Sequence, residues 1–135
     1  MNILAICHTI IVENKNNEIA YNASSPDELA LVNAARHFGY VFKDRDQENN
    51  IVIEIKGFAN KVEKHELLNV IEFTSARKRM TVIIKRNDGK IICMTKGADS
   101  HIMPRLRAGQ DQLINQTVNF IDGYANEGLR TLILA

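Results

Sequence analysis

The chain has 135 residues, of which 45% are hydrophobic, and this length suits one compact core and leaves no room for a second domain. Seventeen Lys and Arg residues against sixteen Asp and Glu residues give a net charge of +1, so no overall field attracts nucleic acid or an anionic membrane. The longest apolar stretch, Ile3 to Val12, is broken by His8 and Thr9, falls short of the ~20 residues that cross a bilayer, and lacks a basic leader. The sequence predicts one soluble domain, residues 1–135, with no signal segment.

The first segment, Ile3 to Val12, has the length of a buried helix or a buried strand, and its periodicity does not decide between them. Glu13 to Glu18 is rich in Asn and charge, which predicts a loop or a hairpin tip. Cys7 and Cys93 lie far apart in an otherwise ordinary composition, so we expect two reduced thiols in the core of a cytosolic protein.

A helix start is specified at Ser25. Ser25 with Glu28 three residues later forms a capping box, and Pro26 suits the first helical position. The predicted helix covers 25–38, with Gly39 as its left-handed stop and an inner stripe made of Leu31, Ala34, Ala35 and Phe38. On these residues alone, capping is a sufficient role for Glu28. Asp27 is sufficiently explained as an acid in the first turn of a helix.

The middle of the chain is rich in strand signals. A charged, Asn-rich loop is predicted at Lys43 to Asn50, and Asn87-Asp88-Gly89 is a strong hairpin turn. Met80, Val82 and Ile84 alternate with Thr81, Ile83 and Lys85, which indicates a strand with one better-buried face. The predicted strands are Tyr40 to Phe42, Ile51 to Ile55, strands within Lys61 to Phe73, Thr81 to Lys85, and Lys90 to Lys96.

A second amphipathic helix is predicted from Asp111 to the Gly128 stop, followed by a last strand, Leu129 to Ala135, cut short at the end of the chain. Strand pairs combined with two helices, without a βαβ repeat or a glycine-rich phosphate loop, predict an α+β fold with an antiparallel sheet. The expected inner face of the second helix consists of Leu113, Ile114, Thr117, Val118, Ile121 and Tyr124.

The most informative stretch begins at Phe73 and continues through three consecutive cations, Arg77, Lys78 and Arg79. An exposed ring can stack on a base, and the cations can reach phosphate oxygens. The predicted hairpin would bring Lys96 close to Lys78, and the missing side chain of Gly97 would let a ligand approach the backbone. A solvated charge run beside a core Phe73, and a plain Lys-Gly turn, explain the same residues without a ligand.

Four motifs in order carry a resemblance to a known family. They are SPDE at 25–28, FTSARKRM at 73–80, TKGAD at 95–99 and EGLRTL at 127–132. Together they resemble the nucleotide-binding domain of P-type ATPases. The forms of the first two, with Ala5 to Thr9 and Tyr21-Asn22-Ala23, are similar to the type IV phospholipid-transporting (flippase) branch rather than to the cation pumps.

The resemblance implies a twisted antiparallel sheet flanked by helices and a set of ATP-binding residues. The aromatic that stacks on adenine matches Phe73, the lysine at the floor of the adenine pocket matches Lys96, and the arginine near the phosphates matches Arg130. Glu28 matches a glutamate near the adenine. The implied ATP-binding set is Glu28, Phe73, Ser75, Lys78, Lys96 and Arg130.

The resemblance also implies a role within a larger pump. The chain lacks an Asp-Lys-Thr-Gly phosphorylation motif and an actuator Thr-Gly-Glu motif. The resemblance therefore implies a cytoplasmic domain cut from an integral membrane protein, with no catalytic residue of its own. ATP would be the substrate, and its terminal phosphate would pass to an aspartate on another domain. Mg²⁺ would be required by the parent enzyme without protein ligands here. The expected partners are the phosphorylation and actuator domains of the same chain, with no nucleic acid, no direct membrane contact and a monomeric state.

Three alternatives stay open at this point. One is the nucleotide domain of a cation-pumping P-type ATPase. Another is a non-catalytic interaction module in which the cations of residues 77–79 dock an acidic partner. Single-stranded RNA binding is a third, although a single suitable aromatic and a net charge near zero argue against it.

Overall fold

The computed structural model describes residues 1–15, 18–57 and 60–135. Its helices are α1 (Asn2–Ile6), α2 (Pro26–His37), α3 (Asp99–Ile102), the 3-10 turn η1 (Met103–Arg105) and α4 (Asp111–Asn126). Its strands are β1 (Ile11–Lys15), β2 (Glu18–Asn22), β3 (Tyr40–Arg45), β4 (Asn50–Ile55), β5 (Lys61–Ile71), β6 (Arg79–Lys85), β7 (Ile91–Gly97) and β8 (Ile133–Leu134).

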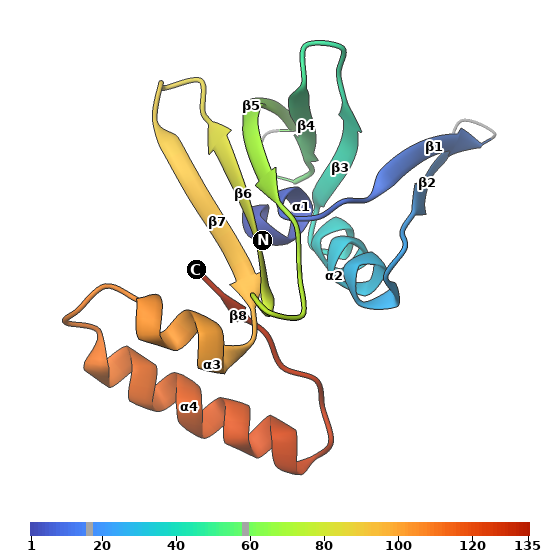
Figure 1. Cartoon of the computed structure of the whole chain (residues 1–135). Helices are drawn as coiled ribbons and strands as arrows, with labels where there is room; N and C mark the ends of the chain where they lie inside the picture. The colour runs from blue at the N-terminus through green and yellow to red at the C-terminus, as the bar shows by residue number, and fades with distance from the viewer. Residues whose placement is uncertain (16–17, 58–59) are drawn as a thin grey trace.

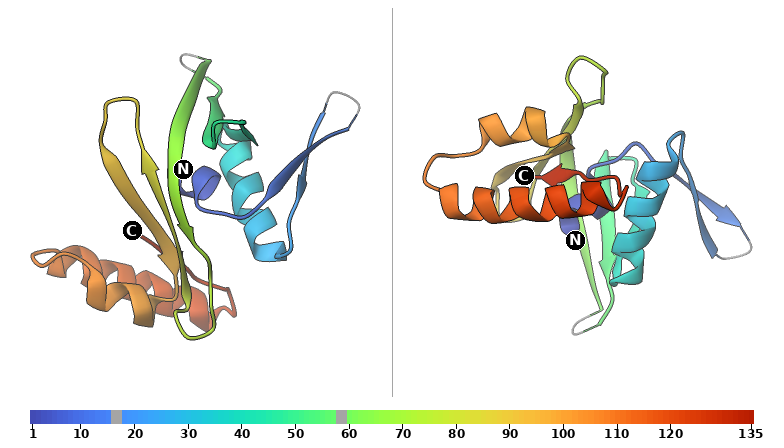
Figure 2. Two further views of the ribbon diagram at one scale, coloured as in Figure 1. Left: turned by 45° about the horizontal axis from the view of Figure 1, so that its top comes forward. Right: turned by 90° about the horizontal axis from the view of Figure 1, so that it is seen from below.

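Strands β3 to β8 form one antiparallel sheet in chain order, and it is strongly curled (Figure 1). The predicted α+β fold with an antiparallel sheet is confirmed. Strands β1 and β2 form a separate hairpin that projects away from the sheet (Figure 2). The stretch from Ile3 to Val12 therefore contains a short helix and the start of a strand, and the tip at 16–17 lies outside the described residues. The loop predicted over 43–50 was too long, because β3 continues to Arg45.

The core lies between one face of the sheet and the helices α1 and α2. In β6 the side chains of Met80, Val82 and Ile84 are at most 2% exposed, which confirms the face predicted from their alternation. The other members of the core are Ala5, Ile6, Cys7, Ile10, Val32, Ala35, Phe42, Ile51, Ile53 and Leu67. Cys7 is a buried free thiol, as predicted, and burial raises its pKa to about 11. Cys93 is exposed, so the prediction that it lies in the core was wrong.

Helix α2 begins and ends where the sequence predicted. The Oγ of Ser25 accepts a hydrogen bond from the Glu28 amide at 3.4 Å, and Gly39 has a φ of 87°. A Cβ at Gly39 would also lie 2.9 Å from the Lys56 carbonyl oxygen, so this position needs glycine on two grounds. The predicted inner stripe was shifted, because α2 turns Val32 and Ala35 into the core and leaves Phe38, its C-cap residue, 61% exposed.

The hairpin of β6 and β7 forms as predicted. The Arg86 amide donates to the Lys90 carbonyl at 2.9 Å, and Gly89 has a φ of 81°. The register pairs Met80 with Lys96, so Lys96 lies on the same face of the sheet as the core residues of β6.

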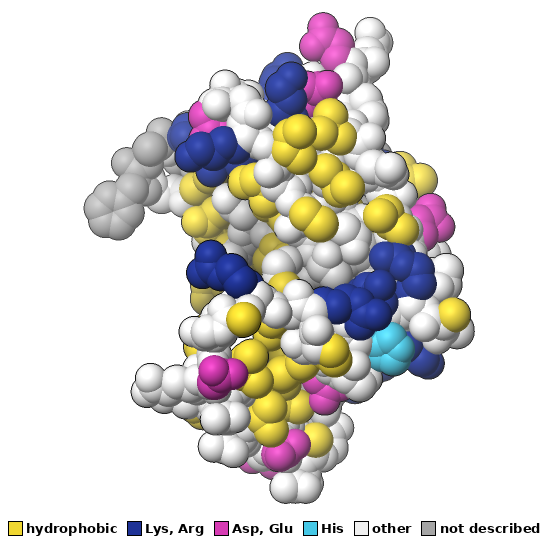
Figure 3. Space-filling model, turned by 60° about the vertical axis from the view of Figure 1, so that its left-hand side comes forward, with side chains coloured by type: hydrophobic (Ala, Val, Ile, Leu, Met, Phe, Trp, Pro, Cys, Tyr) yellow, Lys and Arg dark blue, Asp and Glu magenta, His cyan; other side chains and the backbone are white. Residues whose placement is uncertain are grey.

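Helices α3 and α4 lie at the far end of β7 (Figure 1). Helix α4 runs to a stop at Gly128, whose φ of 76° confirms the prediction, but its predicted inner face was too wide. Only Ile114, Thr117 and Ile121 are half-buried, and Leu113, Val118 and Tyr124 are exposed. Figure 3 shows hydrophobic side chains gathered in the lower part of the molecule, where Figure 1 places α3 and α4, and a second group in the upper part.

The predicted last strand shortens to Ile133–Leu134, which pairs with the end of β7. Among the described helices, none combines the length and the apolar content that crossing a membrane requires.

Candidate functional site

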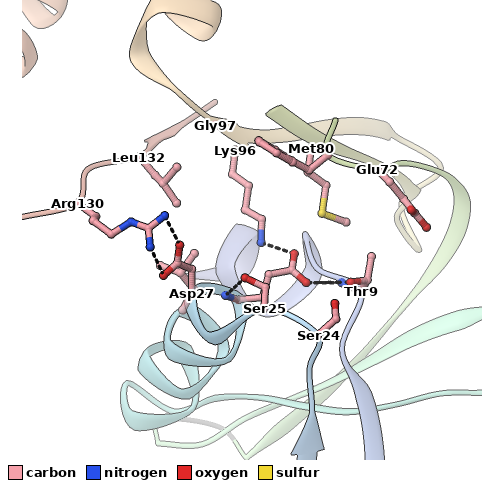
Figure 4. A pocket seen from close by; sticks show the side chains of 13 residues that line it. Thr9, Ser24, Ser25, Asp27, Glu72, Met80, Lys96, Gly97, Arg130 and Leu132 are labelled. Carbon is pink, nitrogen blue, oxygen red and sulfur yellow. Dashed lines mark hydrogen bonds and ion pairs between the residues drawn. The ribbon is translucent and has the colours of Figure 1, made fainter. Parts of the chain in front are cut away.

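A pocket of about 490 Å³ opens between the N-terminus of α2, the ends of β6 and β7, and the segment between α4 and β8 (Figure 4). Four of the six predicted ATP-binding residues line it, namely Glu28, Phe73, Lys96 and Arg130. They come from four segments that are far apart in the sequence. The remaining lining residues are Thr9, Ser24, Ser25, Asp27, Leu31, Glu72, Met80, Gly97 and Leu132.

The floor of the pocket is an ion pair. The Nζ of Lys96 lies 2.8 Å from Oε1 of Glu28, and the two side chains are only 9% and 14% exposed. Thr9 donates to the other carboxylate oxygen of Glu28 through its amide at 3.2 Å and its hydroxyl at 2.9 Å. The Glu28 carboxylate thus accepts three hydrogen bonds and does not reach back to the Ser25 amide, so only half of the predicted capping box forms.

These donors decide the charge state of Glu28. Burial by itself would raise the pKa of this carboxyl group, but the hydrogen bond and the positive charge of Lys96, with the two donors of Thr9, outweigh it. The net effect holds the pKa of Glu28 below its ordinary value. Glu28 is therefore a carboxylate at neutral pH, paired with Lys96.

The mouth of the pocket holds a second ion pair, formed by the neighbouring carboxylate. Nη1 of Arg130 donates to Oδ1 of Asp27 at 3.1 Å, and Nη2 lies 2.9 Å from Oδ2 (Figure 4). The Arg130 side chain is 84% exposed and that of Asp27 is 48% exposed. Asp27 therefore has a specific partner beyond the helix-dipole role that was predicted for it.

The ring of Phe73 lines the pocket and is 58% exposed. It follows the end of β5, and the turn after it is closed by the Lys78 amide, which donates to the Thr74 carbonyl at 2.8 Å. The guanidinium of Arg77 donates to the Glu72 carbonyl at 3.0 Å. The alternative in which Phe73 belongs to the core is therefore wrong, and its ring is available to a ligand.

Ser75 and Lys78 are exposed in the same loop and do not line the pocket. The hairpin places Lys78 and Lys96 at the same end of β6 and β7, where the Ala98 amide donates to the Lys78 carbonyl at 3.0 Å and Lys96 pairs with Met80. Lys78, however, has a φ of 52°, which interrupts the extended backbone before β6. Lys96 points into the pocket (Figure 4), and Lys78 is absent from its lining.

Gly97 lines the pocket, and its missing side chain also affects how the two strands pack. A Cβ at this position would lie 2.5 Å from the Lys78 carbonyl oxygen and 2.5 Å from the Arg79 Cβ. The missing side chain therefore allows the ends of β6 and β7 to pack closely beside the pocket.

The sequence reasoning missed several lining residues, above all Thr9 and the pairing of Asp27. The polar break that Thr9 makes in an apolar stretch was the available signal. Three carboxylates, Asp27, Glu28 and Glu72, line the pocket against two cations, Lys96 and Arg130. The lining thus has no excess of positive charge. No group of three or more His, Cys, Asp and Glu residues that could hold a metal ion occurs within 1–15, 18–57 and 60–135.

The curled antiparallel sheet and its helices define a known class of ATPase domain. The sequence model of a family described as "P-type ATPase, cytoplasmic domain N" matches residues 1–135. The chain therefore belongs to the family of P-type ATPase N domains. The family description agrees with the predicted cytoplasmic domain of a membrane protein.

Individual relatives point to one branch of this family. The chain is 43% identical over 134 residues to human "Phospholipid-transporting ATPase ID", and 44% identical over 137 residues to "Phospholipid-transporting ATPase 10" of Arabidopsis thaliana. It is 42% identical over 132 residues to "Phospholipid-transporting ATPase IC" of Xenopus tropicalis. Each match covers 98% of this chain but only 10–11% of the relative. The predicted resemblance to phospholipid-transporting ATPases is thus confirmed.

Proposed function

We propose that this chain is the ATP-binding domain of a phospholipid-translocating P-type ATPase. The observation that carries the proposal is the convergence of Glu28, Phe73, Lys96 and Arg130 on one pocket. Its volume of about 490 Å³ falls within the range of about 300–1,000 Å³ typical of small-molecule sites. The names of the relatives favour phospholipid over cation as the transported substrate.

Within this proposal the pocket divides into a base site and a phosphate site. Adenine stacks on the exposed ring of Phe73, with the Glu28 and Lys96 pair below it offering polar contacts. Arg130, at the mouth, reaches the phosphates with its guanidinium group. Ser75 and Lys78 follow Phe73 in the same loop and remain predictions as further ATP contacts.

The domain's part in catalysis is positioning. It holds ATP and presents the terminal phosphate to an aspartate on a separate phosphorylation domain, so the isolated domain should not turn over ATP. We assign no Mg²⁺ ligand in the pocket, because Asp27 and Glu28 are engaged by Arg130 and Lys96. The Mg²⁺ that the parent enzyme uses is expected to enter with the phosphates. The phosphorylation and actuator domains of the same chain are the expected partners of a monomeric domain.

An ATP titration followed by backbone amide chemical shifts tests the proposal. One stacked base is worth about 1–3 kcal/mol, and exposed charge contacts add little, so we expect a Kd from about 0.1 mM to several millimolar. The shifts should cluster near Glu28, Phe73 and Lys96, and chelating Mg²⁺ should change the Kd little. A silent spectrum at several millimolar ATP would contradict ATP binding and favour the interaction module.

Phe73→Ala separates stacking from a role in folding. Because the ring is exposed, the variant should stay folded and bind ATP, ADP and AMP about five- to 150-fold more weakly, since all three share the adenine. Phe120→Ala is the matched control, because Phe120 is 66% exposed and lies outside the pocket. Equal losses in the two variants, or unfolding of Phe73→Ala, would reject the stacking role.

A further inference from the structure

The proposed function assigns the guanidinium group of Arg130 to the phosphates of ATP, but this group is already engaged in the ion pair at the mouth. Both terminal nitrogens of Arg130 contact the two oxygens of Asp27, at 3.1 and 2.9 Å, in a closed fork. Within the described part of the chain, Arg130 has no other hydrogen-bond or ion-pair partner. As the pocket stands, its phosphate-reaching cation is already neutralised by a carboxylate.

The two partners of this pair are not equally free to move. Asp27 is the second residue of α2, whose first turn is capped by Ser25, so its carboxylate stays at the rim of the pocket. The Arg130 side chain is 84% exposed and lies on the segment between α4 and β8. An exposed pair of this kind is weak, so a phosphate can draw the arginine away from it.

We propose that Asp27 competes with the phosphate chain for Arg130 and thereby weakens the binding of ATP more than that of AMP. This inference rests on the proposed function. A guanidinium group grips a carboxylate and a phosphate with the same planar set of N–H donors, so the two anions are alternatives for it. The competition grows with the charge and length of the phosphate chain. Asp27 is thus a residue that sets nucleotide selectivity, without a contact to the base.

A positioning role for Asp27 would have the opposite sign. If the carboxylate served to hold Arg130 in its binding pose, its loss would weaken ATP binding. Competition instead requires that removing the carboxylate charge strengthens it. The direction of the change therefore separates the two roles.

The test compares Asp27→Asn with the unaltered chain by calorimetric titration of ATP, ADP and AMP. We expect ATP to bind about three- to tenfold more tightly, ADP to gain less, and AMP to be nearly unchanged. Asp111→Asn is the matched control, because it removes the same charge from the first turn of α4, outside this pocket. It should leave all three affinities unchanged.

A second variant tests whether the effect passes through Arg130. In an Arg130→Ala background, Asp27→Asn should give no gain for ATP. A gain that persists there, an equal gain from Asp111→Asn, or weaker or unchanged ATP binding by Asp27→Asn would each overturn the inference while the proposed function stands. Absence of ATP binding by the unaltered chain would overturn the proposed function itself.

Discussion

Two adjacent carboxylates on the first turn of α2 form ion pairs of very different character. Glu28 pairs with Lys96 at the floor of the pocket, where the side chains are 14% and 9% exposed. Asp27 pairs with Arg130 at the mouth, where they are 48% and 84% exposed. The chemistry is nearly the same, so the difference lies in the surroundings. It shows how one helix turn can supply both a structural contact and a replaceable one.

The energetic consequence of this difference is large. Breaking a buried pair leaves an uncompensated charge and typically costs about 3–5 kcal/mol, whereas an exposed pair is worth about 0–1 kcal/mol. The floor pair is buried because the register places Lys96 opposite Met80 on the core face of the sheet. Thr9 then satisfies the remaining carboxylate oxygen of Glu28.

The largest effect should come from Lys96→Met. This change leaves the Glu28 carboxylate buried without its cation, so we expect the free energy of unfolding at neutral pH to fall by about 3 kcal/mol. Urea denaturation measures it. Adding Glu28→Gln should restore part of the loss, because the uncompensated charge is then removed. If Lys96→Met is as stable as the unaltered chain, the floor pair has no structural role and the contrast with the mouth disappears.

A pH titration should give the next largest effect, through His8, the neighbour of Thr9. Nδ1 of His8 accepts from the Ile10 amide at 3.2 Å and Nε2 contacts the Ala5 carbonyl at 2.9 Å, an arrangement that suits the neutral ring. Burial lowers the pKa of His8 from 6.5 to about 4. The unfolded chain therefore binds the proton first. The resulting stability is full above about pH 6.5 and is lost as the pH falls toward 4, by about 2–3 kcal/mol.

Urea denaturation between pH 7 and pH 4 checks this slope. His8→Gln should flatten it. His65→Gln is an informative comparison, because burial also lowers the pKa of His65 and gives a slope of the same sign. The lowered pKa of Glu28 acts in a separate window, since its stabilisation is lost only as the pH falls below about 4.5. If the free energy of unfolding does not change between pH 6.5 and 4.5, the pKa of His8 is the same in the folded and the unfolded chain, which would contradict this prediction.

Gly97→Ala probes the close packing beside the floor and should have an intermediate effect. Its Cβ would lie 2.5 Å from the Lys78 carbonyl oxygen, so the ends of β6 and β7 must separate at a cost of about 1–3 kcal/mol. Gly123→Ala is the matched control, because it lies within α4 with no atom within 4 Å of the added Cβ. That variant should gain about 0.4–1 kcal/mol. Thermal unfolding that ranks the two variants in the opposite order would reject this packing.

Arg130→Ala should have the smallest effect on stability. It tests the ion pair at the mouth, as Lys96→Met tests the one at the floor. Because the pair is exposed, the free energy of unfolding should change by less than about 1 kcal/mol. ATP and ADP affinities should fall more than that of AMP, since the guanidinium group has less to grip on a short phosphate chain. Calorimetric titration measures this order, and equal losses for all three nucleotides would place Arg130 at the base instead.

Local signals predicted much of the fold, because caps, turns and alternation act over a few residues. The Ser25 cap, the Gly39 and Gly128 stops, and the turn at Gly89 were all found in this way. The same rules made the inner face of α4 too wide, because its apolar positions form one broad stripe, of which Ile114 and Ile121 are half-buried, as is Thr117.

The candidate site was predictable only where the family motifs lay. The predicted hairpin placed Lys78 and Lys96 at the same end of two paired strands, but it could not foresee the positive φ of Lys78 that precedes β6. The pairing of Asp27 with Arg130 joins residues 103 positions apart, and no local pattern announces such a contact. The contact of Thr9 with Glu28 depends in the same way on how α1 docks against α2.

The spread of the pocket along the sequence has a consequence for biosynthesis. Its lining runs from Thr9 to Leu132, so the first and last parts of the 135 residues must both have left the ribosome before it can close. At about 5–20 residues per second, synthesis of the stretch from Thr9 to Leu132 takes roughly 6–25 s. Before Arg130 is synthesised, Lys96 can already pair with Glu28 at the floor, but the ion pair at the mouth cannot form. Nascent chains arrested before Arg130 should therefore show no ATP-dependent protection from proteolysis, whereas chains in which Leu132 has left the ribosome should show it.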